Sequence, residues 1–198
     1  MTMESTRRAL HGVAELVLAG PQYRRSGTIR LQVVPGGFGT VADPELRVVG
    51  GHLVCGEVRV PLSENSCSGL ARAVGVDVGV AEGVYGDGSG VTPGEALVVD
   101  DEVVAALMDA YAKGDAALRA LGGTPVLWPE HFDLGVTLDE VNYGVSPGDG
   151  YRGVPYAYVG PWKAREGAFW NAPFGAARPL EEGLDLDAFF AEGRRLTA

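Results

Sequence analysis

Lysine, cysteine and long apolar runs are scarce in this chain of 198 residues, and each scarcity excludes a class of protein. Only Lys113 and Lys163 are lysines, and 26 acidic side chains outnumber 16 basic ones, which gives a formal charge of −10. Phosphate backbones and anionic lipid surfaces repel an acidic protein, so we expect it to bind neither nucleic acid nor membranes. No apolar run approaches the roughly 20 residues of a membrane span.

The start of the chain also lacks the pattern of a secretory signal peptide. His11 and Glu15 interrupt its apolar stretch, and no small-residue cleavage site follows. We therefore expect a cytoplasmic protein in which Cys55 and Cys67 stay reduced. The preference for arginine over lysine, with abundant glycine, alanine and valine, is typical of GC-rich bacterial genomes.

The pattern of apolar residues predicts a single α+β domain over residues 1–198. The apolar period is helical over 5–20, where Gly20-Pro21 should end the helix, and again over 101–121 and 184–196. Segments between these helices alternate with a period of two, without a βαβ rhythm. We expect a mainly antiparallel sheet, either one curved sheet or two packed layers. The predicted strands are 28–34, 46–48, 58–60, 76–80, 124–138, 155–162 and 169–174.

Three glycine-containing segments are interpreted as turns, over 35–39, Gly50-Gly51 and 146–150. Gly50-Gly51 separates two strands as a hairpin turn. Residues 35–39 are rich in glycine but lack the spacing of a phosphate loop and open no helix. Residues 144–148 match G-x-S-x-G, yet Pro147 and Gly148 follow the serine with turn chemistry, which argues against a nucleophile elbow. The acidic run 181–187 is interpreted as helix capping.

The best candidate for a functional site lies between positions 128 and 162. On a strand, His131 and Asp133 would share a face, where they could act as a catalytic acid–base pair. Glu140 could complete a mixed metal site with them, but the three His and two Cys lack zinc spacing, so we expect no metal. Aromatic and amide side chains nearby would form the walls of a ligand pocket. The predicted ligand-binding residues are Trp128, Asn142, Tyr143, Tyr156, Tyr158 and Trp162.

Three functions stay open on this reading. The preferred one is binding of a small molecule in the aromatic and polar pocket. The second is an enzyme that uses His131 and Asp133, and the third is an oligomeric scaffold without a pocket. The opposite interpretation, a solvated face beside ordinary core aromatics, is also open. The sequence identifies no cofactor, and it leaves open whether the chain forms a homodimer.

Three segments of the same region resemble a family. They are Leu127-Trp128-Pro129-Glu130-His131-Phe132-Asp133-Leu134, Asn142-Tyr143-Gly144 with Ser146-Pro147-Gly148-Asp149, and Pro155-Tyr156 to Pro161-Trp162. They are similar to an uncharacterised group of actinobacterial proteins, and distantly to a bacterial family of unknown function with HFDLS, FGFSxGD and PYFY-like segments. The resemblance covers residues 125–162 best and 27–41 faintly. It implies a shared fold and a shared pocket, and it assigns no activity.

Overall fold

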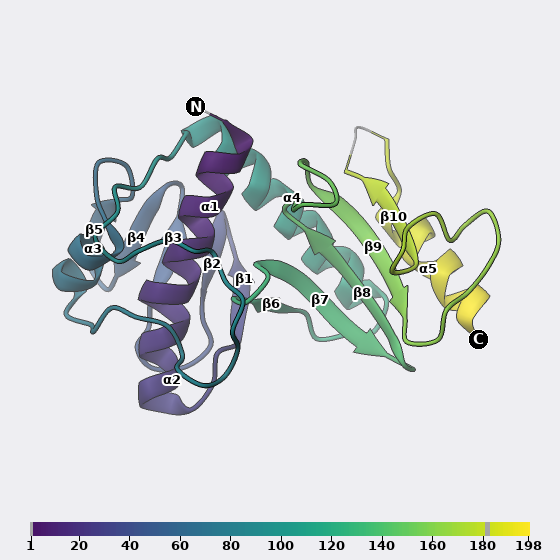
Figure 1. The fold of residues 1–198 in the computed structure, drawn as a ribbon, viewed down its shortest axis with the longest axis horizontal. Coiled ribbons are helices and arrows are strands. Elements are labelled where there is room, and N and C mark those ends of the chain that lie inside the picture. Colours follow the sequence, from purple (N-terminus) through teal and green to yellow (C-terminus); the bar gives the residue numbers. More distant parts are fainter. Residues whose placement is uncertain (1, 181–182) are drawn as a thin grey trace. The chain divides into compact units, whose positions relative to one another are not determined.

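The computed structural model describes residues 2–180 and 183–198, and the chain divides into two compact units. Unit 1 comprises Met1–Asp109 and Leu127–Phe132, and unit 2 comprises Ala110–Val126 and Asp133–Ala198. The predicted α+β class with antiparallel strands is confirmed, as are the N-terminal, central and C-terminal helices (Figure 1). The expectation of a single domain stays a prediction, because contacts define a compact unit and do not show independent folding.

Unit 1 combines a long N-terminal helix, a short helix and an antiparallel sheet. The strand order in this unit is β6–β1–β2–β3–β4–β5. Its helical elements are α1 (Met3–Val13), the π-helix η1 (Ala14–Ala19), α2 (Gly20–Ser26), α3 (Cys67–Val74) and the first part of α4 (Asp101–Ala120). Its strands are β1 (Leu31–Val34), β2 (Gly37–Thr40), β3 (Arg47–Val49), β4 (His52–Cys55), β5 (Val58–Pro61) and most of β6 (Val126–Trp128).

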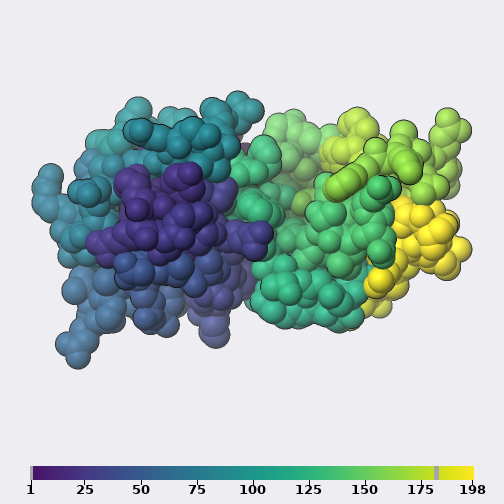
Figure 2. Space-filling model, turned by 90° about the horizontal axis from the view of Figure 1, so that it is seen from below, coloured from purple at the N-terminus to yellow at the C-terminus, as the bar shows by residue number. Residues whose placement is uncertain are grey.

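The N-terminal helix continues through α1, η1 and α2, so the predicted end at Gly20-Pro21 is wrong. Proline lacks an N–H, and the Leu16 carbonyl instead accepts a hydrogen bond from Gly79 N at 2.9 Å. A side chain at position 20 would clash with Gly79 O, so glycine lets the segment approach. The backbone of residues 76–80 therefore bonds to the helix, and the strand predicted there is absent. Figure 2 shows the segment after α3 beside this helix.

One face of the sheet in unit 1 carries the core. The π-helix packs on β1 and β2, and Leu31 and Phe38 on these strands are fully buried. Alternate residues point to opposite faces of a strand. Gln32, Gly39 and Arg47, which are paired neighbours across β1, β2 and β3, therefore lie on the face away from the helix.

Three further predictions, one of a turn and two of strands, need correction. The predicted turn over 35–39 is shorter, because β2 already begins at Gly37. The predicted strand 124–138 breaks at a turn over 129–132, where Phe132 has φ of 53°. The predicted edge strand 169–174 is replaced by β10 (Ala176–Pro179), which begins beyond Pro173, a residue that cannot donate a ladder hydrogen bond.

Unit 2 packs two helices against one face of its antiparallel strands. The strand order is β7–β8–β9–β10, and α5 packs on β8 and β9. Gly114 of α4 and Gly193 of α5 bring these helices against Val145 and Val159, both fully buried. Asp185 caps α5 as predicted, whereas Glu181 and Glu182 lie outside the described residues. The further elements are β7 (Asp133–Leu138), β8 (Val141–Ser146), β9 (Tyr156–Pro161) and α5 (Leu186–Thr197).

No helix among the residues that the structure describes is both long enough and apolar enough to cross a bilayer.

Candidate functional site

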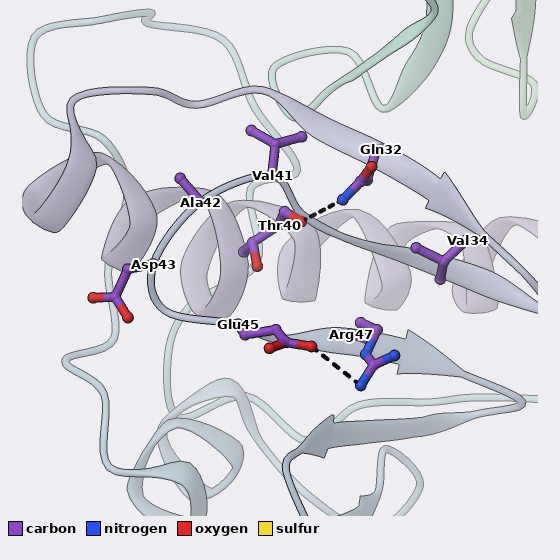
Figure 3. A pocket seen from close by; sticks show the side chains of 8 residues that line it. All are labelled: Gln32, Val34, Thr40, Val41, Ala42, Asp43, Glu45 and Arg47. Carbon is purple, nitrogen blue, oxygen red and sulfur yellow. Dashed lines mark hydrogen bonds and ion pairs between the residues drawn. The ribbon is translucent and has the colours of Figure 1, made fainter.

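A hollow of about 490 Å³ lies at the end of β2 in unit 1 (Figure 3). This volume falls within the roughly 300–1,000 Å³ that is usual for small-molecule sites. We call it the β2 hollow. Its lining residues are Gln32, Val34, Thr40, Val41, Ala42, Asp43, Glu45 and Arg47.

Glycine in β2 makes room for neighbouring groups beside the hollow. Gly39 lies in the ladder between Gln32 and Arg47, both of which line the hollow. A Cβ at Gly39 would lie 2.7 Å from Leu46 O and 2.8 Å from the Cγ of Arg47, which is too close for any side chain to be added without strain. Glycine at this position therefore lets the stem of Arg47 lie against β2, whose four residues are all buried.

Buried Gln22 fixes one side of the rim of the β2 hollow, where Val41 and Ala42 lie. This side chain of α2 is fully buried, and its Oε1 accepts hydrogen bonds from Val41 N at 2.7 Å and Ala42 N at 2.9 Å. Its Nε2 donates to the carbonyls of Thr28 and Arg30, both at 2.9 Å. All four hydrogen-bonding positions of the amide are therefore used, which holds the rim against α2 and the start of β1.

The rest of the rim is fixed by Thr40 and by the end of α2. The Thr40 hydroxyl is buried, donates to Pro44 O at 2.7 Å and accepts from Leu46 N at 3.0 Å. The Ser26 hydroxyl donates to Asp43 O at 2.9 Å. A loop tied to the fold by buried side chains pays little ordering entropy when it meets a ligand, because it is already ordered.

The charged side chains of the hollow are ion-paired and exposed. Arg47 Nη2 lies 3.3 Å from Glu45 Oε1, and Arg25 Nη1 lies 3.3 Å from Asp43 Oδ2. Figure 3 shows the Glu45–Arg47 pair at the rim and Gln32 donating to Thr40 O, a hydrogen bond of 2.9 Å. The hollow therefore presents carboxylate, guanidinium and amide groups next to a mostly aliphatic wall.

A smaller hollow of about 240 Å³ lies beside the start of α1 in the same unit. Arg8 and Glu95 both line it and form an ion pair with each other, and Arg8 also donates to Gly90 O at 2.8 Å. These contacts bind the 90–95 segment to the helix, so they account for the polar groups there.

The predicted site residues of unit 2 form a cluster of tyrosines and aspartates. The ring of Tyr158 on β9 reaches over Gly144 of β8, and its hydroxyl donates to the Asp133 carboxylate on β7. Tyr156 donates to Asp149 Oδ2 at 2.6 Å. Burial, reinforced by these carboxylates, raises the pKa of both phenols. We call these four side chains the Tyr–Asp cluster.

Aromatic neighbours pack around the Tyr–Asp cluster. Tyr151 and Phe174 stand edge to face with ring centroids 5.0 Å apart, and Phe174 stacks on Tyr156 at 6.3 Å. Asp149 also accepts from the backbone N–H groups of Tyr151 and Arg152. Neither hollow described above is lined by these residues. The two phenols and two carboxylates bond to each other, so the geometry is that of a packed sheet face, although Arg152 Nε beside them is buried without a hydrogen-bond partner.

The remaining predicted residues are not gathered around one point. His131 is exposed on the 129–132 turn and belongs to unit 1, whereas Asp133 begins β7 in unit 2. The strand alternation that placed them on one face is broken by the positive φ of Phe132. Trp128 lies under the Arg30 guanidinium, 5.9 Å from its ring centroid.

Asn142, Tyr143 and Trp162 have separate surroundings within unit 2. Asn142 Oδ1 accepts from the Thr137 hydroxyl at 2.8 Å, and more weakly from Trp162 Nε1 at 3.4 Å. Trp162 is 65% exposed. Tyr143 is buried against Phe190 on the core side of the sheet. Tyr143 therefore serves packing, and Asn142 and Trp162 lie at the surface.

Sequence reasoning missed a buried polar cluster on the N-terminal helix. Glu15, in the π-helix, is 2% exposed and accepts from Ser89 N at 2.7 Å. His11 stacks on Phe132 at 5.5 Å, and its Nε2 lies 2.7 Å from Pro129 O and 4.0 Å from Glu15 Oε2. Burial lowers the pKa of His11, although Glu15 opposes that shift.

Tyr85 and Gly88 complete this cluster. Burial, followed by the negative charge of Glu15, raises the pKa of the Tyr85 phenol. The hydroxyl is buried beside that carboxylate without a hydrogen bond of good geometry. A side chain at Gly88 would clash with the Glu15 carboxylate, so glycine lets the 86–90 segment cover it. The signal in the sequence was the pair His11 and Glu15, which interrupts an otherwise apolar stretch.

Among the described residues, no group of three or more His, Cys, Asp and Glu side chains is placed to hold a metal ion. None of the protein-family models, curated proteins or solved structures compared with this chain matches it. The family resemblance of residues 125–162 therefore stays a prediction.

Proposed function

We propose that this protein binds a small polar molecule, and that the β2 hollow of unit 1 is its binding site. The observation that carries the proposal is the rim held in place by Gln22, whose buried amide uses all four hydrogen-bonding positions to anchor it. A rim that is already fixed reduces the entropy that binding would cost. The volume of about 490 Å³ suits a ligand of metabolite size.

Binding is favoured over catalysis because the strongly perturbed groups lie elsewhere. An active site usually combines a hollow with titratable groups whose pKa values are shifted for their task. The pKa values of His11 and Tyr85 are shifted, but neither residue lines the β2 hollow. The charged residues that do line it are exposed.

The sequence-based proposal placed the ligand in the 128–162 region, and an enzyme with a His131–Asp133 pair was its alternative. The Asp133 carboxylate accepts the Tyr158 hydroxyl, and His131 lies on a turn in the other unit. These observations favour the β2 hollow for the ligand. The scaffold alternative predicts a large apolar interface, which light scattering would test as self-association.

A plug in the hollow tests the proposal. Val41 lines the hollow and is 47% exposed, and Val58 of β5 in the same unit is 45% exposed and does not line it. We expect a screen of small polar compounds by two-dimensional NMR to shift amide signals of residues 32–47. Val41→Trp should abolish these shifts because the indole fills the space, and Val58→Trp should preserve them. Shifts confined to other residues, or binding that survives Val41→Trp, would contradict the proposal.

A further inference from the structure

We infer that the β2 hollow selects a neutral, polyhydroxylated ligand such as a monosaccharide or a cyclitol. This inference rests on the proposed binding function and names the chemical class of the ligand. Its basis is the way in which the charges and hydrogen-bonding groups of the rim are already arranged.

The charges of the rim are balanced within the protein. Each carboxylate at the hollow has its own guanidinium, because Glu45 pairs with Arg47 and Asp43 pairs with Arg25. A charged ligand would have to displace one of these partners or leave its own charge uncompensated. A neutral ligand avoids both costs, since it can bind without breaking either ion pair.

Two other ligand classes fit less well. A phosphorylated ligand usually needs a cluster of cationic groups, whereas the hollow offers Arg47 beside the carboxylates of Asp43 and Glu45. A flat aromatic ligand usually needs aromatic or extended apolar walls, and the lining offers only the small aliphatic side chains of Val34, Val41 and Ala42.

Hydroxyl groups match what the rim presents. A hydroxyl both donates and accepts, a carboxylate only accepts and a guanidinium only donates. Glu45 Oε1 and Arg47 Nη2 are 3.3 Å apart, so an acceptor and a donor stand side by side where two neighbouring hydroxyls could meet them. The Gln32 amide, held by its hydrogen bond to Thr40 O, adds a further polar group on the opposite wall.

The remaining surface suits the C–H face of a saturated ring. Val34 supplies an aliphatic contact on β1, and Val41 and Ala42 supply further aliphatic surface. A ring could therefore approach the sheet while its hydroxyls point toward the rim. This combination of an aliphatic contact with paired donors and acceptors distinguishes a polyol site from a site for ions.

The test uses cyclohexane-ring compounds that differ only in their substituents. We would titrate the full chain with myo-inositol, cyclohexanol, cyclohexylamine and myo-inositol 1-phosphate, followed by two-dimensional NMR, and add glucose as a second polyol. We expect myo-inositol or glucose to shift signals of residues 32–47 with an affinity that is unchanged between low and high salt. The other three ring compounds should bind at least about tenfold more weakly, because each lacks the hydroxyl array or adds a charge.

Variants separate the possible outcomes. Glu45→Gln keeps the shape but removes the acceptor-only carboxylate, and we expect it to weaken polyol binding about tenfold, as losing a hydrogen bond to a charged group does. Val58→Trp should not affect it. If the amine or the phosphate binds more tightly in a manner that Val41→Trp abolishes, the polyol inference is wrong while the binding function stands. If polyols fail to bind and no screened compound shifts residues 32–47, both are wrong.

Discussion

A glycine in the sheet makes room for a different kind of side chain in each of the two units. In unit 2, Gly144 lies under the ring of Tyr158, which crosses it to reach Asp133. In unit 1, Gly39 lies between Gln32 and Arg47, and the stem of Arg47 packs against it. The same backbone feature thus seats a tyrosine ring in one unit, and in the other it seats the stem of an arginine that lines a hollow.

The polar groups around these two glycines also differ in where their hydrogen bonds go. In the Tyr–Asp cluster, phenols and carboxylates satisfy each other, so little hydrogen-bonding capacity points outward. Around the β2 hollow, buried Gln22 and Thr40 are satisfied by backbone, and the charged side chains face solvent in exposed pairs. The comparison teaches that concentration of aromatic and polar residues along a sequence marks a packed face as readily as a ligand site.

Removing the tyrosine should turn the closed face into an open one. We expect Tyr158→Ala to lower the free energy of unfolding by about 4 kcal/mol, because it deletes ring packing and leaves the Asp133 carboxylate without the phenol. Added p-cresol should restore part of the melting temperature by occupying the vacated space over Gly144. Tyr151→Phe, at a 43% exposed ring, is the control and should change little. A loss below about 1 kcal/mol in the free energy of unfolding would show that packing of the Tyr158 ring contributes little to stability.

Removing the Gln22 side chain should loosen the rim of the β2 hollow in unit 1. Gln22→Ala leaves two backbone N–H groups and two carbonyls without their partner, and we expect a loss of about 3 kcal/mol in chemical denaturation. Hydrogen exchange at Val41 and Ala42 should accelerate in the same variant. Gln32→Ala removes one hydrogen bond and should cost about 1 kcal/mol. Unchanged exchange at both amides would mean that Gln22 does not hold the rim.

Acid should weaken unit 1 through His11. Burial lowers its pKa from 6.5, so the unfolded chain takes up the proton more readily than the folded chain does. The free energy of unfolding that neutral His11 contributes is therefore complete above pH 6.5. It is lost as the pH falls toward the pKa of the folded state, by about 1.4 kcal/mol for each pH unit between the two pKa values. Glu15 opposes the shift, whereas His131 adds to it.

Denaturation between pH 7.5 and 5.5 measures this dependence. His11→Gln should flatten the loss of stability in that range, and His52→Gln, at an imidazole outside the cluster, should retain it. If His11→Gln and the unmodified chain lose stability in parallel, the assignment to His11 is incorrect.

The smallest effect concerns the exposed pair of the hollow. Glu45→Gln should change the free energy of unfolding by only about 0.3 kcal/mol, because the Glu45 side chain is 82% exposed and water screens its charge. The same substitution should nevertheless weaken the binding of a polyol. A variant that loses stability and binding together would show that Glu45 supports the fold and not the ligand.

Much of the fold followed from local patterns. The helix at 101–121, the turn at Gly50-Gly51 and the strand at 155–162 are confirmed, because each depends on short-range apolar periodicity or on turn residues with positive φ. The turn joins β3 to β4, which was not predicted, instead of to the predicted strand 58–60. The strands predicted over 76–80 and 169–174 are absent. The first bonds to the N-terminal helix instead of to a ladder, which no local pattern reveals.

The candidate site followed much less well. The sequence brought together Tyr156, Tyr158 and Asp133, and the structure does place them in one cluster, but their hydroxyls turn inward to carboxylates. The hollow depends on Gln22 and Thr40, which look like ordinary polar residues until the helix packs on the sheet. Their hydrogen-bond partners lie 6 to 20 residues away for Gln22 and 4 to 6 for Thr40, in loops whose path only packing defines.

The sequence by itself determined the N-terminal, central and C-terminal helices and the antiparallel run of the strands, since apolar period and turn chemistry are local properties. Only the tertiary structure decided which glycine lies under a tyrosine ring and which lies against an arginine at a hollow. That choice depends on where a distant tyrosine ring or a buried amide comes to rest, and packing across the sheet, which spacing along the chain does not encode, sets both positions.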